Sequence, residues 1–137
     1  MPHFGGISSG ILKTCDARLQ VLFSKVVERF DCTVLTGHRG EIEQDLVFEI
    51  GASKLCWPQS KHNQTPSRAI DISPYPIPEN WGKGSRDEYE KFKYFAFYVL
   101  GVAAALNIPL RWGGDWDNDF DTQDQDFNDL LHFELDE

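Results

Sequence analysis

The sequence has little of three things, and each shortage argues against a class of protein. Its three cysteines, Cys15, Cys32 and Cys56, include no CxxC pair, so we expect free, mostly buried thiols and no disulfide framework. No apolar run approaches the roughly 18 residues of a membrane-spanning helix. Lys and Arg number 13 against 22 Asp and Glu, a net charge of −9. Such a chain is a poor electrostatic partner for nucleic acid or an anionic membrane surface, and its natural ligands are cations.

The length and the N-terminus set two further expectations. A chain of 137 residues with 41% hydrophobic residues has the size and apolar content of one domain, so we expect a single domain over residues 1–137. The first ten residues, MPHFGGISSG, lack a basic segment followed by an apolar one. We therefore expect no Sec signal and synthesis in a cytoplasm.

Hydrophobic periodicity and breaker residues predict an irregular alternation of helices and short strands. Ser85 is expected to cap the longest helix, with Glu88 completing a capping box. Without regular βαβ units, the pattern favours an α+β fold with helices packed on a small, largely antiparallel sheet. The expected helices are 12–30, 41–53 and 85–107, and the expected strands are 32–37, 69–76, the start of 109–116, and 130–135.

Two expected strands carry polar side chains on the face away from their apolar residues. Because side chains alternate along a strand, Asp71 in AIDIS lies opposite the two isoleucines, and His132 and Glu134 in LLHFEL lie opposite leucine and phenylalanine. His62 lies nine residues before Asp71, in a polar loop that can fold back over the strand. A carboxylate buried in an apolar strand is costly unless something pairs with it. A metal ion would supply that partner.

A His–Asp–His set with one open position is a common catalytic arrangement for zinc. Zinc hydrolysis also needs a base, and Asp129, three residues before His132, is our candidate, with Glu134 competing. From these residues alone, other interpretations stay open. His62 could be a surface histidine, His132 a hydrogen-bonded histidine near a strand edge, and Asp71 a carboxylate bonded to backbone.

The segments SKHN…PSRAIDISPYP and NDLLHFEL together resemble a known family, the zinc-dependent peptidoglycan peptidases that include D-alanyl-D-alanine carboxypeptidases, L-alanyl-D-glutamate endopeptidases and many phage endolysins. The family motif is roughly S-x-H-x-x-G-x-A-x-D followed by (D/E)-x-x-H. The resemblance extends from about Val34 to Leu135. It implies a single catalytic domain with the hedgehog/D-Ala-D-Ala peptidase type of fold.

Carried over by position, the resemblance implies zinc on His62, Asp71 and His132 and a general base at Asp129. The GHR segment that ends at Arg39 matches a family G-x-R segment, so Arg39 would bind the substrate and stabilise the developing oxyanion.

Two further segments bear on the resemblance. RWGGDW, at 111–116, is similar to a family segment that lines the cleft, although Trp112 and Trp116 could instead pack over the sheet. The family usually places six residues between the first histidine and the aspartate, whereas this chain has eight. The longer loop can still close on a metal, because two extra residues add little closure entropy.

The segment 115–129, DWDNDFDTQDQDFND, is rich in aspartate. The alternating oxygens of Asp117, Asp119 and Asp121 are similar to a calcium loop, but the EF-hand pattern lacks its glycine and its final glutamate. A solvated acidic loop is the alternative. Our hypothesis is that Ca²⁺ orders this loop and so helps to assemble the zinc site.

The expected function is zinc-dependent hydrolysis of a peptidoglycan stem peptide, at the L-Ala–D-Glu bond, by a monomeric phage endolysin. It would be made in the host cytoplasm and act on the cell wall, with no nucleic acid or membrane as partner. A D,D-carboxypeptidase is the second candidate. A non-catalytic metal- or wall-binding module and a protein that binds calcium alone are further alternatives.

Overall fold

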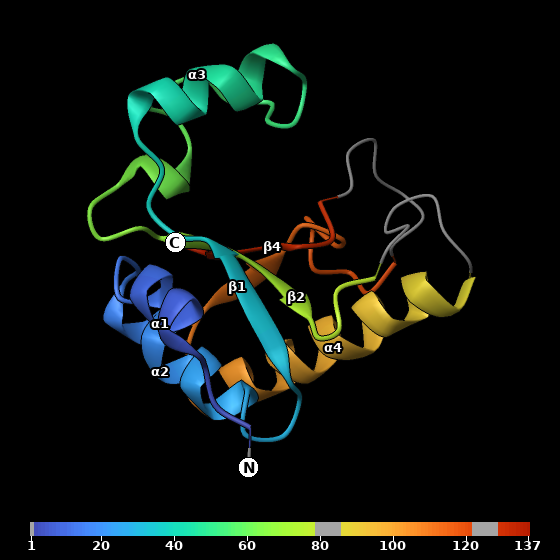
Figure 1. The fold of residues 1–137 in the computed structure, drawn as a ribbon. Helices are drawn as coiled ribbons and strands as arrows, with labels where there is room; N and C mark the ends of the chain where they lie inside the picture. Colours follow the sequence, from blue (N-terminus) through green and yellow to red (C-terminus); the bar gives the residue numbers. More distant parts are fainter. Residues whose placement is uncertain (1, 79–85, 122–128) are drawn as a thin grey trace.

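The structure, a computed structural model, describes residues 2–78, 86–121 and 129–137 (Figure 1). Within these residues a sheet of four strands has the order β1-β2-β4-β3, with every neighbouring pair antiparallel. This confirms the expected α+β class. The elements are α1 (Gly6–Leu12), α2 (Ala17–Val26), β1 (Cys32–Thr36), α3 (Glu41–Glu49), the 3₁₀ helix η1 (Lys61–Asn63), β2 (Ala69–Pro74), α4 (Arg86–Ala105), β3 (Leu110–Trp112) and β4 (His132–Leu135).

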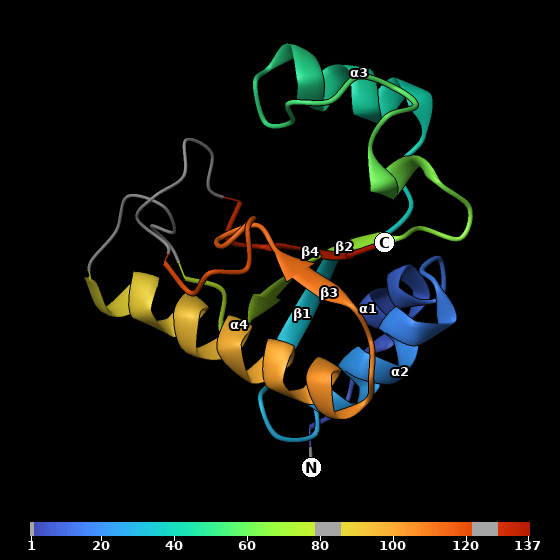
Figure 2. The same ribbon diagram turned by 180° about the vertical axis from the view of Figure 1, so that it is seen from behind.

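The sheet has one apolar face and one polar face, as the alternation of side chains predicts. Ile70 and Ile72 of β2 and Phe133 of β4 are fully buried in the core, which α2 and α4 complete. The ring of Phe23 in α2 meets Phe133 edge-on at 5.7 Å. Figures 1 and 2 show α2 and α4 on this side of the sheet and α3 on the opposite side. The polar face of the sheet therefore looks toward α3 and the segment that follows it.

The prediction of a single helix over residues 12–30 is wrong, because α1 ends at Leu12 and α2 extends only from Ala17 to Val26. The chain forms α1, turns at residues 13–16, and starts α2 where the Asp16 carboxylate accepts the backbone N–H of Arg18 at 2.9 Å. The backbone N–H of Asp16 also donates to Ser67 O at 2.8 Å. A hydrogen bond to a distant segment thus interrupts a pattern that is locally helical, and such contacts override periodicity.

The other predicted elements appear with shifted ends. Helix α3 ends at Glu49, and Gly51 follows with a φ of +81°, a conformation that favours glycine. Helix α4 ends at Ala105, before Asn107. The predicted cap at Ser85 lies outside the described residues. Helix η1, which the sequence pattern did not predict, has a local cause, because the Ser60 hydroxyl caps it and the Asn63 side chain returns a hydrogen bond.

Helix length and hydropathy also bear on membrane insertion. Across the described ranges, no helix combines the length and the apolar content that crossing a bilayer would require.

Candidate metal centre

Two neighbouring strands and one capped turn position the central group of side chains. In the β2–β4 pair, Asp71 is directly opposite His132, so both side chains project from the polar face of the sheet. His62 comes from η1. The backbone N–H of Arg68 donates to Lys61 O at 3.1 Å and so closes the loop between η1 and β2. The eight-residue gap is therefore compatible with bringing His62 to the strand.

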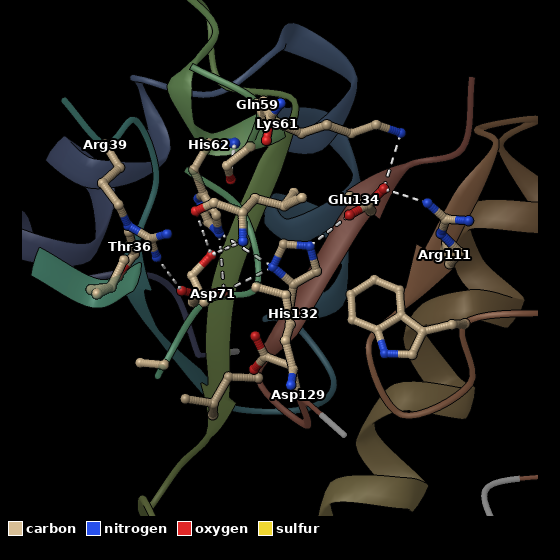
Figure 3. Close-up of a pocket in the computed structure, with 18 residues that line it drawn as sticks. Thr36, Arg39, Gln59, Lys61, His62, Asp71, Arg111, Asp129, His132 and Glu134 are labelled. Atoms are coloured by element: carbon tan, nitrogen blue, oxygen red, sulfur yellow. Dashed lines mark hydrogen bonds and ion pairs between the residues drawn. The ribbon is translucent and has the colours of Figure 1, made fainter. Parts of the chain in front are cut away.

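The three side chains converge on one point (Figure 3). His62 Nε2 and His132 Nδ1 lie 3.2 and 3.3 Å from the same oxygen, Asp71 Oδ1, and 3.3 Å from each other. Both histidines are buried. Each residue offers one ligand atom, and these atoms lie within 4.8 Å of one another. The group could hold a metal ion.

Partners on the far side of each imidazole set the tautomers. His62 Nδ1 lies 2.7 Å from the carbonyl oxygen of Gly37, which can only accept, so Nδ1 carries the hydrogen and Nε2 keeps its lone pair. His132 Nε2 lies 2.9 Å from Glu134 Oε1, which leaves the lone pair of a neutral His132 on Nδ1. When both histidines are neutral, two imidazole lone pairs and a carboxylate oxygen face one another. This donor set fits a divalent cation, and zinc accepts both imidazole and carboxylate ligands.

The pKa values of His132 and Asp71 also indicate that this group stabilises a positive charge. Burial by itself lowers the pKa of His132, but hydrogen bonds to Asp71 and Glu134 outweigh it and raise the pKa to about 9. Burial alone would raise the pKa of Asp71, yet the electrostatic effect of His62 and the hydrogen bonds with both histidines hold it well below its usual range. The hydrogen bonds to Asp71 and Glu134 therefore stabilise a positive charge at this point.

Asp129 lines the same pocket, in the turn that leads into β4. Its backbone N–H donates to Gly113 O at 2.9 Å, and its carbonyl oxygen accepts from the backbone N–H of His132 at 3.1 Å. A Cβ on Gly113 would lie 2.3 Å from Asp129 O, so only glycine allows this approach. Burial first, and then the negative charge of Asp71, raise the pKa of the Asp129 carboxyl. A raised pKa suits a group that takes up and releases a proton.

Glu134, the competing base, is already engaged at both oxygens. Oε1 accepts from His132, while Oε2 accepts from Arg111 Nη2 at 2.8 Å and pairs with Lys61 Nζ at 3.0 Å. Burial raises the pKa of Glu134, but these partners outweigh it and hold the pKa below its usual range. A carboxylate that is so strongly held as an anion is a poor proton acceptor, so its environment suits orienting His132 better.

Arg39 lies on the other side of the group. Its Nη2 is 3.3 Å from Asp71 Oδ2, and its Nη1 donates to Gln44 Oε1 at 3.0 Å. Gln44 is fully buried, accepts also from Asn63 Nδ2, and donates to Leu55 O at 2.6 Å. It thereby ties Arg39 to α3 and to the segment after that helix.

Other residues singled out in the sequence have varied positions. His38 is exposed. Trp112 is buried in the core with its indole N–H on Leu130 O, whereas Trp116 lines the pocket. The sequence pattern gave no sign of the Lys61–Glu134–Arg111 cluster. Arg111 faces Glu134 across the β3–β4 pair, so a correct strand register would have found it.

The acidic loop is described only in part, because residues 122–128 lie outside the described residues. The carboxylates of Asp115, Asp117 and Asp119 lie within 4.8 Å of one another and could hold a cation. Asp115 is buried, and its carboxylate already accepts the backbone N–H of Asp119 and of Phe120. Calcium binding here stays a prediction.

These side chains border one pocket of about 840 Å³ on the polar face of the sheet. Three comparisons show what the chain resembles. A family model described as phage L-alanyl-D-glutamate peptidase matches residues 2–136. No curated protein matches the sequence. Among solved structures, the L-Ala D-Glu endopeptidase ChiX of Serratia marcescens aligns with a TM-score of 0.69 and 21% identity, over 97% of this chain and 89% of that chain. At this identity the likeness shows the fold.

Proposed function

The chain belongs to the phage L-alanyl-D-glutamate peptidase family and hydrolyses the L-Ala–D-Glu bond of peptidoglycan, and we propose that it does so with one zinc ion on His62, Asp71 and His132. The observation that supports zinc is the convergence of two imidazole lone pairs and one carboxylate oxygen, with tautomers set by Gly37 O and Glu134. Zinc bound there would polarise the scissile carbonyl and make an attacking water more acidic.

The protein side chains then perform the proton transfers. Asp129 takes the proton from the attacking water and passes it to the leaving nitrogen of D-Glu. Its raised pKa favours both steps, because it can hold the proton between them. Arg39, which Gln44 holds beside Asp71, donates hydrogen bonds to the oxygen that becomes negative during attack. Glu134 keeps His132 in the tautomer whose Nδ1 is free to bind a metal.

The test combines product analysis with metal analysis. Purified peptidoglycan is digested with the zinc-loaded protein, and mass spectrometry should find new L-Ala carboxyl ends and D-Glu amino ends. Removing the metal should abolish lysis, and added zinc should restore it. Asp129→Ala should keep the metal and lose activity, whereas His132→Ala should lose both. Equal lysis by the wild type and both variants would exclude this assignment.

A non-catalytic wall-binding module predicts binding to peptidoglycan without any new chain ends. A D,D-carboxypeptidase predicts release of free D-Ala. We further propose that the protein acts on the cell wall as a monomer, and sedimentation of the zinc-loaded protein tests its oligomeric state.

We propose Ca²⁺ as a second ion at the acidic loop. Its support is the approach of the three carboxylates of Asp115, Asp117 and Asp119. A chelator selective for calcium should lower activity while the zinc content stays constant. Unchanged activity after such treatment would remove the proposal.

A further inference from the structure

On one wall of the pocket, two cationic side chains pair with a single carboxylate. Lys61 Nζ and Arg111 Nη2 approach the same atom, Glu134 Oε2, at 3.0 and 2.8 Å. The other oxygen of Glu134 accepts from His132. Two cations therefore share one carboxylate, which leaves an excess of one positive charge on this wall, in a chain whose net charge is −9.

Arg111 has hydrogen-bonding capacity that the protein does not use. A guanidinium has five N–H donors, and in the described ranges Arg111 places only Nη2 on Glu134. Its Nε has no partner in these ranges but is buried, so the terminal nitrogens are the donors that a ligand can reach. Lys61 differs, because its Nζ also donates to the carbonyl oxygen of Leu135. The guanidinium lies 5.6 Å from the ring centre of Trp116, and the Arg111 side chain is 32% exposed where it lines the pocket. Arg111 is therefore the cation on this wall that a ligand can reach.

The position of this charge relative to the metal centre indicates its ligand. Glu134 bridges His132 and Arg111. Its Oε1 lies 2.9 Å from His132 Nε2, and its Oε2 lies 2.8 Å from Arg111 Nη2. Arg39, across the pocket, already bonds Asp71 and Gln44. An anion bound to Arg111 would thus be separated from His132 by the Glu134 carboxylate alone, and would lie close to the scissile bond.

We propose that Arg111, with Lys61 beside it, binds the free carboxylate of the D-Glu residue that follows the scissile bond, and so selects D-Glu over its amidated form. This inference rests on the proposed function. A glutamyl residue has two carboxyl groups, and only one continues the peptide chain. When the side-chain carboxyl continues it, as in peptidoglycan, the free one is attached to the Cα that carries the scissile nitrogen. Arginine suits this group because its planar fork matches a carboxylate.

The test compares two synthetic peptides, N-acetyl-L-Ala-γ-D-Glu-L-Lys and the same peptide with D-isoglutamine, where a carboxamide replaces the carboxylate. For zinc-loaded wild type we expect a KM about 10- to 100-fold lower for the acid, with similar kcat, because hydrogen bonds to charged groups are the stronger ones. Arg111→Gln should remove most of this preference by raising the KM of the acid peptide alone. Arg111→Lys should restore part of it, since it keeps the charge without the fork.

Arg68→Gln is the matched control. Arg68 also pairs with a glutamate, Glu137, at 2.6 Å and has a similarly exposed side chain (26%), but it does not line the pocket. This variant should keep the wild-type preference. Equal KM values for the two peptides in wild type would overturn the proposal. So would an equal loss for both peptides in Arg111→Gln, because a merely structural role predicts that result.

A binding measurement separates this subsite from the hydrolytic mechanism. Calorimetry on zinc-loaded Asp129→Asn should give a Kd about 10- to 100-fold lower for the acid peptide, and adding Arg111→Gln should remove the difference. A preference in binding supports the subsite even if wild type cleaves neither peptide. Absence of cleavage would refute the proposed function instead. Equal Kd values with normal cleavage by wild type would refute the subsite alone.

Discussion

Gly113→Ala tests whether Asp129 must be held in place by the end of β3. The added Cβ would lie 2.3 Å from Asp129 O and 3.0 Å from its Cβ. Ordinary contact begins near 3.4 Å, so the Asp129 backbone must retreat by about 1 Å or the chain must distort. The same glycine donates its N–H to His132 O and accepts from Asp129 N–H. The substitution therefore displaces the proposed base together with the strand that carries a proposed ligand.

The magnitude follows from two costs. Overpacking of this kind destabilises a fold by about 1–3 kcal/mol. A misplacement of about 1 Å at a reacting group lowers the rate by roughly 100-fold. We therefore expect kcat for peptidoglycan hydrolysis to fall about 100-fold, with the free energy of unfolding lowered by about 1–3 kcal/mol. Rates are measured by release of new amino ends, stability by urea denaturation, and zinc content by metal analysis.

Gly101→Ala is the control for this substitution. Gly101 lies in α4, and a Cβ there would meet nothing within 4 Å. Alanine in place of glycine in an exposed helix should raise stability by about 1 kcal/mol and leave the rate unchanged. Wild-type kcat in Gly113→Ala, with normal zinc content, would refute the idea that this contact holds Asp129.

Three further predictions follow from contacts in the structure. Glu134→Gln should weaken zinc affinity by about 10- to 100-fold, because it removes the charge that orients His132; zinc titration measures this, and unchanged affinity would contradict it. Gln44→Ala leaves the side-chain donors of Arg39 and Asn63 unpaired and should cost about 2–4 kcal/mol of stability. Urea denaturation measures this cost, and a loss below about 1 kcal/mol would show that water replaces the amide. Burial raises the pKa of the Cys32 thiol to about 12 from an ordinary 9.0, so its contribution to stability is complete below pH 9 and is lost as pH rises toward 12. Cys32→Ala should therefore flatten the loss of stability across that range, and at pH 8 a thiol reagent should label exposed Cys56 first.

Local periodicity was sufficient for much of this protein. The alternation of side chains in AIDIS and LLHFEL separated the apolar face of the sheet from the face that carries Asp71, His132 and Glu134. Each of those assignments depends on the pleat of a single strand, so a short stretch of sequence contains all the information needed. Glycine and proline located the strands and the helix at Glu41–Glu49 in the same local way, although the structure shifts their ends.

Tertiary structure decided what those side chains do for one another. The β2–β4 register places Asp71 opposite His132, 61 positions along the chain, and no local pattern specifies a register between strands so far apart. Glu134 was a candidate base by its face, but the approach of Lys61 and Arg111 from two other elements stabilises its anion and engages it with His132. A side chain's face is a property of its own strand, whereas its protonation and its partners depend on the charges that folding brings within a few ångströms.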